Sequence, residues 1–174
     1  MYGSKFVLHI SVCAVFSIGA FAQNSPPAAV VKAFYAFDRS HSQVLNRRNI
    51  DARKQWFSAS LYKLFLNELK REREYLKENP PDKPHFGDGL PFTPIDEPCQ
   101  ARGKSYRYLY RVSRTTVKKK KAEVWVEFYY PKQCEQHLVE FMLKLVNTKG
   151  QWPINDVVYE DTSHLTDDLQ RRDY

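Results

Sequence analysis

Alternating apolar and polar residues dominate positions 106–159 and predict four consecutive antiparallel β-strands. Successive side chains of a strand point to opposite faces of a sheet, so each run should have one apolar face. These faces comprise Tyr106, Tyr108, Tyr110 and Val112 in the first run; Val124, Val126, Phe128 and Tyr130 in the second; Val139, Phe141, Leu143 and Leu145 in the third; and Trp152, Ile154, Asp156 and Val158 in the fourth.

The strand register follows from the requirement that apolar faces match across each turn. The matching pairs are Val112 with Val126, Tyr110 with Phe128, Phe128 with Phe141, and Leu143 with Ile154. These pairs centre the three turns on Lys119, between Cys134 and Glu135, and between Thr148 and Lys149, all within polar segments. The register therefore predicts one row across the apolar face, made of Tyr110, Phe128, Phe141 and Asp156.

Helical spacing of apolar residues precedes the predicted sheet. A first helix should start after an N-cap at Ser25 and run to Leu45, and a second should run from Trp56 to the stop at Pro80. Residues 46–55 are expected to form a connection with at most one short helical turn, and the six prolines of residues 80–98 a segment that wraps an edge or mouth of the fold. A short last helix, capped by Ser163, is expected from His164 to Arg171. The sequence thus predicts an α+β protein with two or three N-terminal helices on a curved four-stranded antiparallel meander.

Residues 1–22 have the pattern of a cleaved signal peptide. Lys5 precedes an apolar run at residues 6–18, and Ala20-Phe21-Ala22 gives a small-x-small cleavage site. The run is shorter and more polar than a membrane-spanning helix, and no small-residue lipobox precedes Cys13, so no stable membrane or lipid anchor is expected. We therefore predict export to the periplasm or the extracellular space, with residues 23–174 forming a single α+β domain.

Export would remove Cys13 and leave Cys99 and Cys134. We predict that these two form a disulfide, because exported proteins meet an oxidising compartment and the expected second turn brings Cys134 near the chain that leads into the first strand. Two free structural thiols are the alternative.

The chain carries 27 Lys and Arg against 20 Asp and Glu. Nucleic-acid binding is not expected, because export opposes it and the tyrosines and arginines of residues 106–111 lie on opposite faces of one strand. Lys118 to Lys121 are expected to form a solvated turn that blunts aggregation; the alternative is a basic envelope-surface site that attracts anionic lipid or cell-wall polymer.

Three groups of residues resemble a known family. They are Pro27, Val30, Val31, Phe34 and Tyr35; Asp88 to Phe92; and Gly150, Trp152, Ile154, Asp156, Val157 and Tyr159. Together they resemble the exported bacterial family called domain of unknown function 3828, which is thought to share the nuclear-transport-factor-2-like cone fold. In this chain Gly89 and Leu90 interrupt the family's contiguous Asp-Pro-Phe motif. The resemblance implies a curved sheet closed by helices around a pocket, in a family without an established activity.

Such a pocket gives Asp156 two possible roles. If its carboxyl group points inward among Tyr110, Phe128 and Phe141, burial would raise its pKa and suit a general base that works with a tyrosine, as in an isomerase, dehydratase or hydrolase of cone fold. The structural alternative is that Asp156 accepts hydrogen bonds from a helix N-terminus, a tyrosine or an arginine and holds the sheet to the first helix. The four histidines after residue 23 are expected at the surface, and neither a metal site nor a cofactor is predicted.

The leading hypothesis is a noncatalytic domain that binds a small ligand or a protein. The candidate ligand-binding residues are Tyr35, Tyr106, Tyr108, Tyr110, Phe128 and Phe141, because aromatic rings with polar tips can line an apolar pocket. Core packing is their alternative role. Trp125 and Tyr129 lie on the opposite, charged face of the predicted sheet, which could serve as a partner or homodimer surface.

Overall fold

The computed structural model describes residues 25–94, 98–135 and 137–171. The predicted signal peptide, residues 1–22, lies outside the described residues. The elements are α1 (Pro27–Asp38), α2 (Arg47–Arg53), the 3-10 helix η1 (Lys54–Trp56), α3 (Ala59–Glu78), β1 (Cys99–Ala101), β2 (Lys104–Tyr106), β3 (Leu109–Lys118), β4 (Lys121–Tyr129), β5 (Leu138–Val146), β6 (Ile154–Val158) and α4 (Leu165–Asp168).

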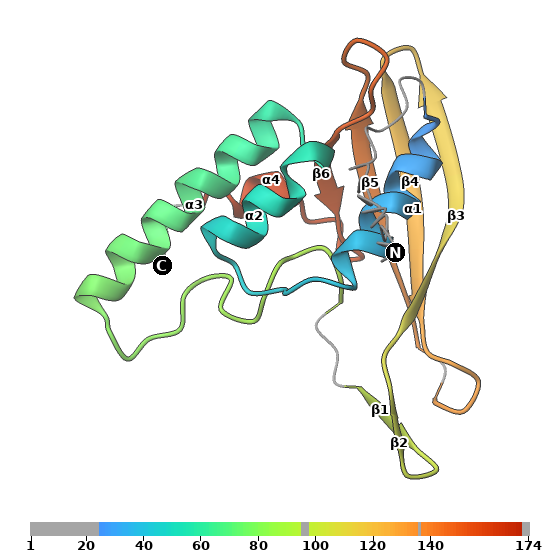
Figure 1. The fold of residues 1–174 in the computed structure, drawn as a ribbon, viewed down its shortest axis with the longest axis horizontal. Helices are drawn as coiled ribbons and strands as arrows, with labels where there is room; N and C mark the ends of the chain where they lie inside the picture. The colour runs from blue at the N-terminus through green and yellow to red at the C-terminus, as the bar shows by residue number, and fades with distance from the viewer. Residues whose placement is uncertain (1–24, 95–97, 136, 172–174) are drawn as a thin grey trace, which may run out of the picture.

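The main sheet is antiparallel with the strand order β3-β4-β5-β6, and it is not closed into a barrel. Figure 1 shows α1 lying across one face of this sheet, with α2 and α3 beside the β6 edge. The chain crosses from helix to sheet edge at Phe57, which bridges Ile154 in parallel, and at Ser58, whose N–H donates to the Ile154 carbonyl over 2.8 Å. The predicted α+β fold class is confirmed.

The first hairpin has the predicted register, with Tyr110 opposite Phe128 and Val112 opposite Val126. A β-bulge at Ser113 then adds one residue to β3, so that Lys118 pairs with Lys121 and the turn falls at the predicted lysines.

The predicted register of the second hairpin is wrong by two residues. Phe128 lies opposite Val139, and Phe141 lies opposite Val126. A shift of two residues leaves every side chain on its predicted face, so alternation alone cannot distinguish the two registers.

The third hairpin differs from its prediction in a way that moves Asp156. Ile154 pairs with Leu145, and a bulge at Asn155 then reverses the alternation, so that Asp156 pairs with Lys144 on the outer face. Val157, which pairs with Leu143, takes the core position instead and is fully buried. The predicted row of Tyr110, Phe128, Phe141 and Asp156 is therefore wrong.

The helices differ from the predictions mainly at their ends. Pro26 rather than Ser25 is the N-cap of α1, and α1 stops at Asp38 instead of continuing to Leu45. The predicted connection at residues 46–55 contains α2 and the start of η1. The predicted long helix is present as α3, but it begins at Ala59 and not at Trp56. Its N-cap is Ser58, whose hydroxyl accepts the Leu61 N–H. The last helix is shorter than predicted and has His164 as its N-cap, not Ser163.

The hydrophobic core lies between the sheet and the helices. Phe128, Phe141 and Ile154 belong to it, as the alternation predicts. Phe92, from the proline-rich segment, is fully buried, and its ring centroid lies 5.1 Å from that of Phe34 and 5.3 Å from that of Phe57. The segment that leads into the sheet therefore contributes to the core rather than only wrapping around it.

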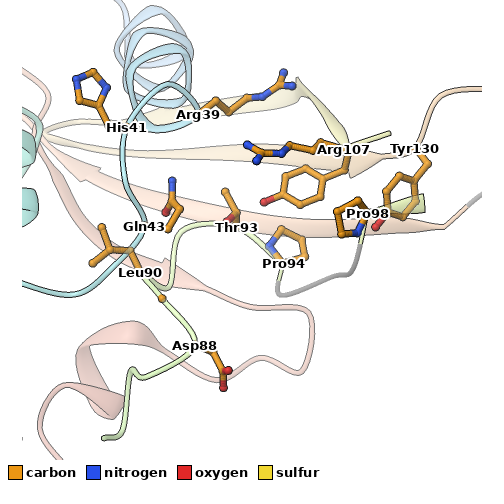
Figure 2. A pocket seen from close by; sticks show the side chains of 12 residues that line it. Arg39, His41, Gln43, Asp88, Leu90, Thr93, Pro94, Pro98, Arg107 and Tyr130 are labelled. Atoms are coloured by element: carbon orange, nitrogen blue, oxygen red, sulfur yellow. The ribbon is translucent and has the colours of Figure 1, made fainter. Parts of the chain in front are cut away.

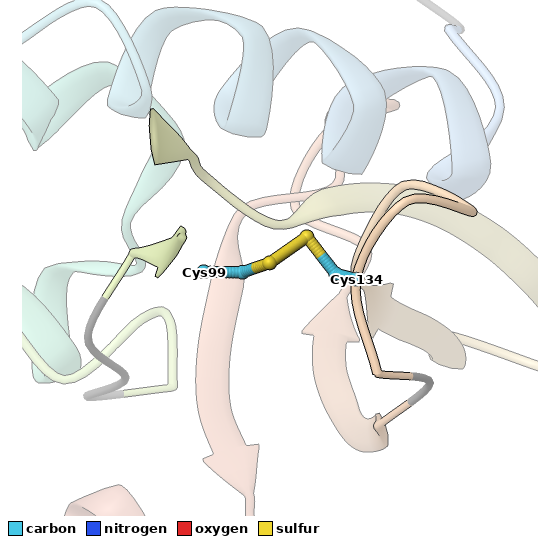
Figure 3. The surroundings of a disulfide bond; sticks show 2 residues. All are labelled: Cys99 and Cys134. Atoms are coloured by element: carbon cyan, nitrogen blue, oxygen red, sulfur yellow. A yellow bond between two sulfur atoms is a disulfide. The ribbon is translucent and has the colours of Figure 1, made fainter. Parts of the chain in front are cut away.

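The predicted disulfide between Cys99 and Cys134 is present, with an S–S distance of 1.98 Å and a Cα–Cα distance of 6.1 Å. It joins β1 to the loop between β4 and β5 (Figure 3). The small β1-β2 hairpin that it anchors was not predicted. Disulfides persist in oxidising compartments, so the bond is typical of a protein outside the cytosol. Within residues 25–94, 98–135 and 137–171, no helix has the length and apolar character needed to cross a membrane.

Candidate functional site

The six aromatic residues predicted to bind a ligand do not surround one pocket. Tyr35 and Phe128 lie in the core, with exposed fractions of 0% and 2%. Tyr106 lies in β2 opposite Cys99. Of the remaining three, Tyr108 lines one cavity and Phe141 lines another. Tyr110 is half-buried beside α1, where its hydroxyl donates to the Lys32 carbonyl over 3.3 Å.

A row of aromatic rings connects the two cavities. The distance between ring centroids is 6.5 Å for Tyr130 and Tyr108, 5.6 Å for Tyr108 and Phe128, and 5.1 Å for Phe128 and Phe141. Phe141 in turn lies 5.1 Å from Tyr159, with the two rings edge to face. Tyr159 was not among the predicted ligand-binding residues, although it ends the predicted strand region as an aromatic residue.

Residues 88–94, which we call the strap, separate the two cavities and fill the space between them. The Tyr35 hydroxyl donates to the Phe92 carbonyl over 2.9 Å, and the Tyr159 hydroxyl donates to the Pro91 carbonyl over 3.1 Å. Burial raises the pKa of both tyrosines well above its usual value. The expected pocket at the centre of the fold is thus occupied by Phe92, and the open space lies on either side of the strap.

The first cavity is basic and has a volume of about 300 Å³. Its lining includes Arg39, His41, Gln43, Asp88, Thr93, Arg107, Tyr108 and Tyr130. Figure 2 shows the guanidinium groups of Arg39 and Arg107 on one side of this cavity, with Gln43 and Thr93 across from them. The Arg39 guanidinium also lies 5.7 Å from the ring centroid of Tyr110.

The second cavity, which we call the acidic groove, has a volume of about 610 Å³. Its apolar lining comprises Phe86, Pro91, Pro94, Val139, Phe141 and Tyr159. Its polar lining comprises His85, Asp88, Thr93, Glu160, Asp161, Ser163 and Asp168. Phe141 belongs to β5, Tyr159 directly follows β6, and Asp168 is the last residue of α4. Three elements and the strap therefore line this groove.

The carboxylates of the acidic groove are arranged by local hydrogen bonds and ion pairs. Asp161 accepts the Ser163 hydroxyl over 2.6 Å and the Ser163 N–H over 3.0 Å, and these bonds hold the pKa of Asp161 below its usual value. Asp168 pairs with Arg171 over 3.3 Å, and Asp88 pairs with Lys83. His85 contacts the fully buried Glu68, with 3.2 Å between Nδ1 and Oε1.

Asp156 does not take the position expected of a general base paired with a tyrosine. Its carboxylate lies 2.6 Å from His164 Nδ1 and accepts the backbone N–H groups of Val157 over 2.9 Å and Thr166 over 3.1 Å. This matches one form of the structural alternative, acceptance of hydrogen bonds at a helix N-terminus, but the helix is α4 and not the first helix. His164 is half-buried beside this carboxylate rather than at the surface as expected.

The outer face of the sheet carries the other candidate residues, Trp125 and Tyr129. Both are half-buried, and Trp125 lies opposite Met142 while Tyr129 lies opposite Leu109. The Arg114 guanidinium stacks 3.9 Å from the Trp125 ring centroid. The two aromatic residues are therefore brought to one face, as predicted.

The described part of the chain contains no group of three or more His, Cys, Asp or Glu side chains arranged to hold a metal ion. The fold is that of an α+β protein in which α1 covers one face of an open antiparallel sheet and α2 and α3 lie beside the β6 edge. Comparison of the chain with protein-family models, curated proteins and solved structures gave no match.

Proposed function

We propose that this chain is an exported, noncatalytic protein that binds a small amphipathic ligand in the acidic groove. The observation that carries the proposal is the groove itself: an apolar floor with polar groups at its rim, of a size typical of small-molecule sites. The phenol group of Tyr159, which would otherwise bring an unsatisfied polar atom to the floor, is already bonded to the Pro91 carbonyl. An apolar ligand would therefore cover rings without burying an unpaired donor.

Export to the periplasm or the extracellular space is part of this proposal. Its support is the signal-like pattern of residues 1–22 together with the disulfide between Cys99 and Cys134. We further propose membership of the domain of unknown function 3828 family and a cone-like fold. The helices-then-meander order supports this, as does the full burial of Phe34, Tyr35 and Phe92, which carry the resemblance.

The proposal can be tested by NMR with a small library of neutral and charged apolar fragments. We expect the amide shifts caused by binding fragments to cluster around Phe86, Val139 and Tyr159. The variant Ser163→Trp, which places a bulky ring at the half-buried rim, should abolish these shifts, whereas Ser113→Trp, on the exposed outer face of β3, should leave them unchanged. Shifts that cluster around Trp125 and Tyr129 instead, or no binding of any fragment, would contradict the proposal.

A second candidate function, self-association through the outer sheet face, is favoured by the position of Trp125 and Tyr129. Their rings lie on one face together with Leu109, Met142 and the exposed Leu138. Aromatic and methionine side chains are enriched in protein interfaces.

A further inference from the structure

The charge of the acidic groove is opposite to that of the chain as a whole. The chain has a formal net charge of +7, yet the described residues that line this groove include four carboxylates and no Lys or Arg. The four are Asp88, Glu160, Asp161 and Asp168. A cleft lined by one sign of charge with apolar walls concentrates ions of the other sign. The groove is thus built to favour a cation over an anion.

Two of these four negative charges remain after the neighbouring cations are taken into account. Lys83 pairs with Asp88, and Arg171 pairs with Asp168. Among the residues that the structure describes, no cationic side chain forms an ion pair with Glu160 or Asp161. Asp161 is oriented by the neutral Ser163, and Arg171 adds only a minor favourable effect on its charged form. Glu160 and Asp161 therefore provide the uncompensated charge of the groove.

The apolar floor lies beside these two carboxylates. Phe141 is 7% exposed and Val139 8% exposed, so both have limited contact with solvent, and Tyr159 packs edge to face on Phe141. Glu160 and Asp161 directly follow Tyr159 in the chain, which places the charged rim at one end of the aromatic floor. A ligand would need an apolar body for the floor and a positive group for the rim.

From this charge complementarity we infer that the ligand of the acidic groove is an amphipathic monocation, an organic amine with an aliphatic or aromatic body. The inference rests on the proposed ligand-binding function and specifies its ligand class. The apolar body covers Val139, Phe141 and Tyr159, while the ammonium group lies between Glu160 and Asp161. Neutral amphiphiles of the same shape gain only the contact with the floor, and carboxylates of the same shape are repelled by the rim.

The test compares three probes that share one alkyl chain: octylammonium, octan-1-ol and octanoate, each titrated into the full protein by calorimetry at low salt. We expect octylammonium to bind about ten-fold more tightly than octan-1-ol, with octanoate weakest. In the double variant Glu160→Gln/Asp161→Asn, the preference for octylammonium over octan-1-ol should fall to about two-fold or less. The side-chain carbonyl of the amide introduced at position 161 can still accept the Ser163 N–H, so the turn should be retained.

A charge-matched control removes two exposed carboxylates of α3 with Glu74→Gln/Glu78→Gln and should keep the full preference. A salt titration of the unmodified protein provides a second measurement that needs no variant: the preference should shrink as the NaCl concentration rises from about 10 to 300 mM. If octan-1-ol binds as tightly as octylammonium, or the preference survives both salt and the rim variant, the inference is wrong while ligand binding stands. If none of the three probes binds, the proposed function itself fails at this groove.

Discussion

At the residue scale, Arg53 and Asp38 form an ion pair inside the fold. Both side chains are fully buried, and Arg53 Nε lies 2.7 Å from Asp38 Oδ1. The other guanidinium nitrogens donate to the carbonyls of Asn49 and Ser42. This set of bonds turns the chain back after α1 and accounts for the end of that helix at Asp38, well before its predicted end at Leu45.

Removing one member of this pair should destabilise the fold strongly. In Arg53→Met, the carboxylate of Asp38 would stay buried without its cation, so we expect a loss of about 3–5 kcal/mol in the free energy of unfolding. Urea unfolding measures it. The control Arg47→Met breaks the ion pair with Asp51, whose members are 63% and 43% exposed, and should change stability little. If the two variants lose the same free energy of unfolding, the buried ion pair stabilises the protein no more than the exposed pair does.

We expect Glu72 to make the free energy of unfolding depend on pH. The residue is 7% exposed, its carboxyl group accepts the Phe86 N–H over 3.0 Å, and burial raises its pKa above the ordinary value of 4.5. As pH rises from 4.5 to the raised pKa, the unfolded chain has released this proton while the folded chain retains it, so stability falls across that window and remains lower above it.

The variant Glu72→Gln removes this titration and keeps an acceptor for the Phe86 N–H. We expect its free energy of unfolding to exceed that of the unmodified protein near neutral pH and to vary less between about pH 4.5 and 7. Denaturant unfolding at several pH values is the measurement. Glu74→Gln, on the exposed face of the same helix, should leave the pH profile unchanged, and a steeper profile in Glu72→Gln would refute the assignment.

At the scale of elements, the disulfide holds an otherwise weakly anchored hairpin to the sheet. The β1-β2 hairpin has three paired positions and projects beyond the main sheet in Figure 1, and Cys99 connects it to the loop after β4. A two-stranded hairpin of this size is marginal by itself. Its order therefore depends on the covalent link.

Replacing both cysteines by serine should destabilise the protein by about 4 kcal/mol, the loop-closure value for the 35-residue separation of the two residues. We also expect faster hydrogen exchange in β1 and β2, with β4 and β5 still protected, because the core does not depend on the bond. Calorimetry and hydrogen-exchange mass spectrometry provide the two readings. Uniformly faster exchange in all strands would show that the bond supports the whole sheet instead.

At the scale of the whole molecule, the two faces of the sheet have different roles. The inner face, covered by α1 in Figure 1, carries the core and the groove, and the outer face carries charged residues around Trp125 and Tyr129. The exposed lysines 118–121 lie at the tip of the first hairpin, which agrees with the expected solvated turn. The proposed ligand groove and the proposed association surface therefore lie on different faces of the sheet.

If the outer face is a dimer interface, the protein should sediment as a dimer at micromolar concentration and Trp125→Ala should weaken the association at least ten-fold. Tyr62→Ala, at a half-buried residue on α3 away from this face, serves as the control and should not change it. Sedimentation velocity distinguishes these cases. A monomeric protein with an unchanged Trp125→Ala variant would leave the groove as the sole proposed site.

The sequence by itself determined the fold class, the faces of the residues in β3 up to its bulge and in β4 and β5, the first hairpin, the long helix and the disulfide. The helix and the strand faces follow from the period of apolar residues, and the first hairpin follows from matching apolar faces across a polar turn. The disulfide follows from the presence of only two cysteines after the predicted signal peptide. The sequence also contained the signal of the groove, since Glu160, Asp161, Asp167 and Asp168 form an acidic segment at the end of a basic chain.

Only the tertiary structure decided the register of β5, the outward position of Asp156 and the burial of Phe92. A shift of two residues preserves the alternation, so the pattern allows either Val139 or Phe141 opposite Phe128. Side-chain packing in the folded protein determines that the partner is Val139. The bulge at Asn155 moves the following β6 residues to the opposite faces of the sheet, and the alternation of apolar and polar residues in the sequence does not reveal it. Phe92 fills the expected pocket because a segment distant from the sheet in sequence packs onto it, and such contacts depend on the whole chain rather than on neighbouring residues.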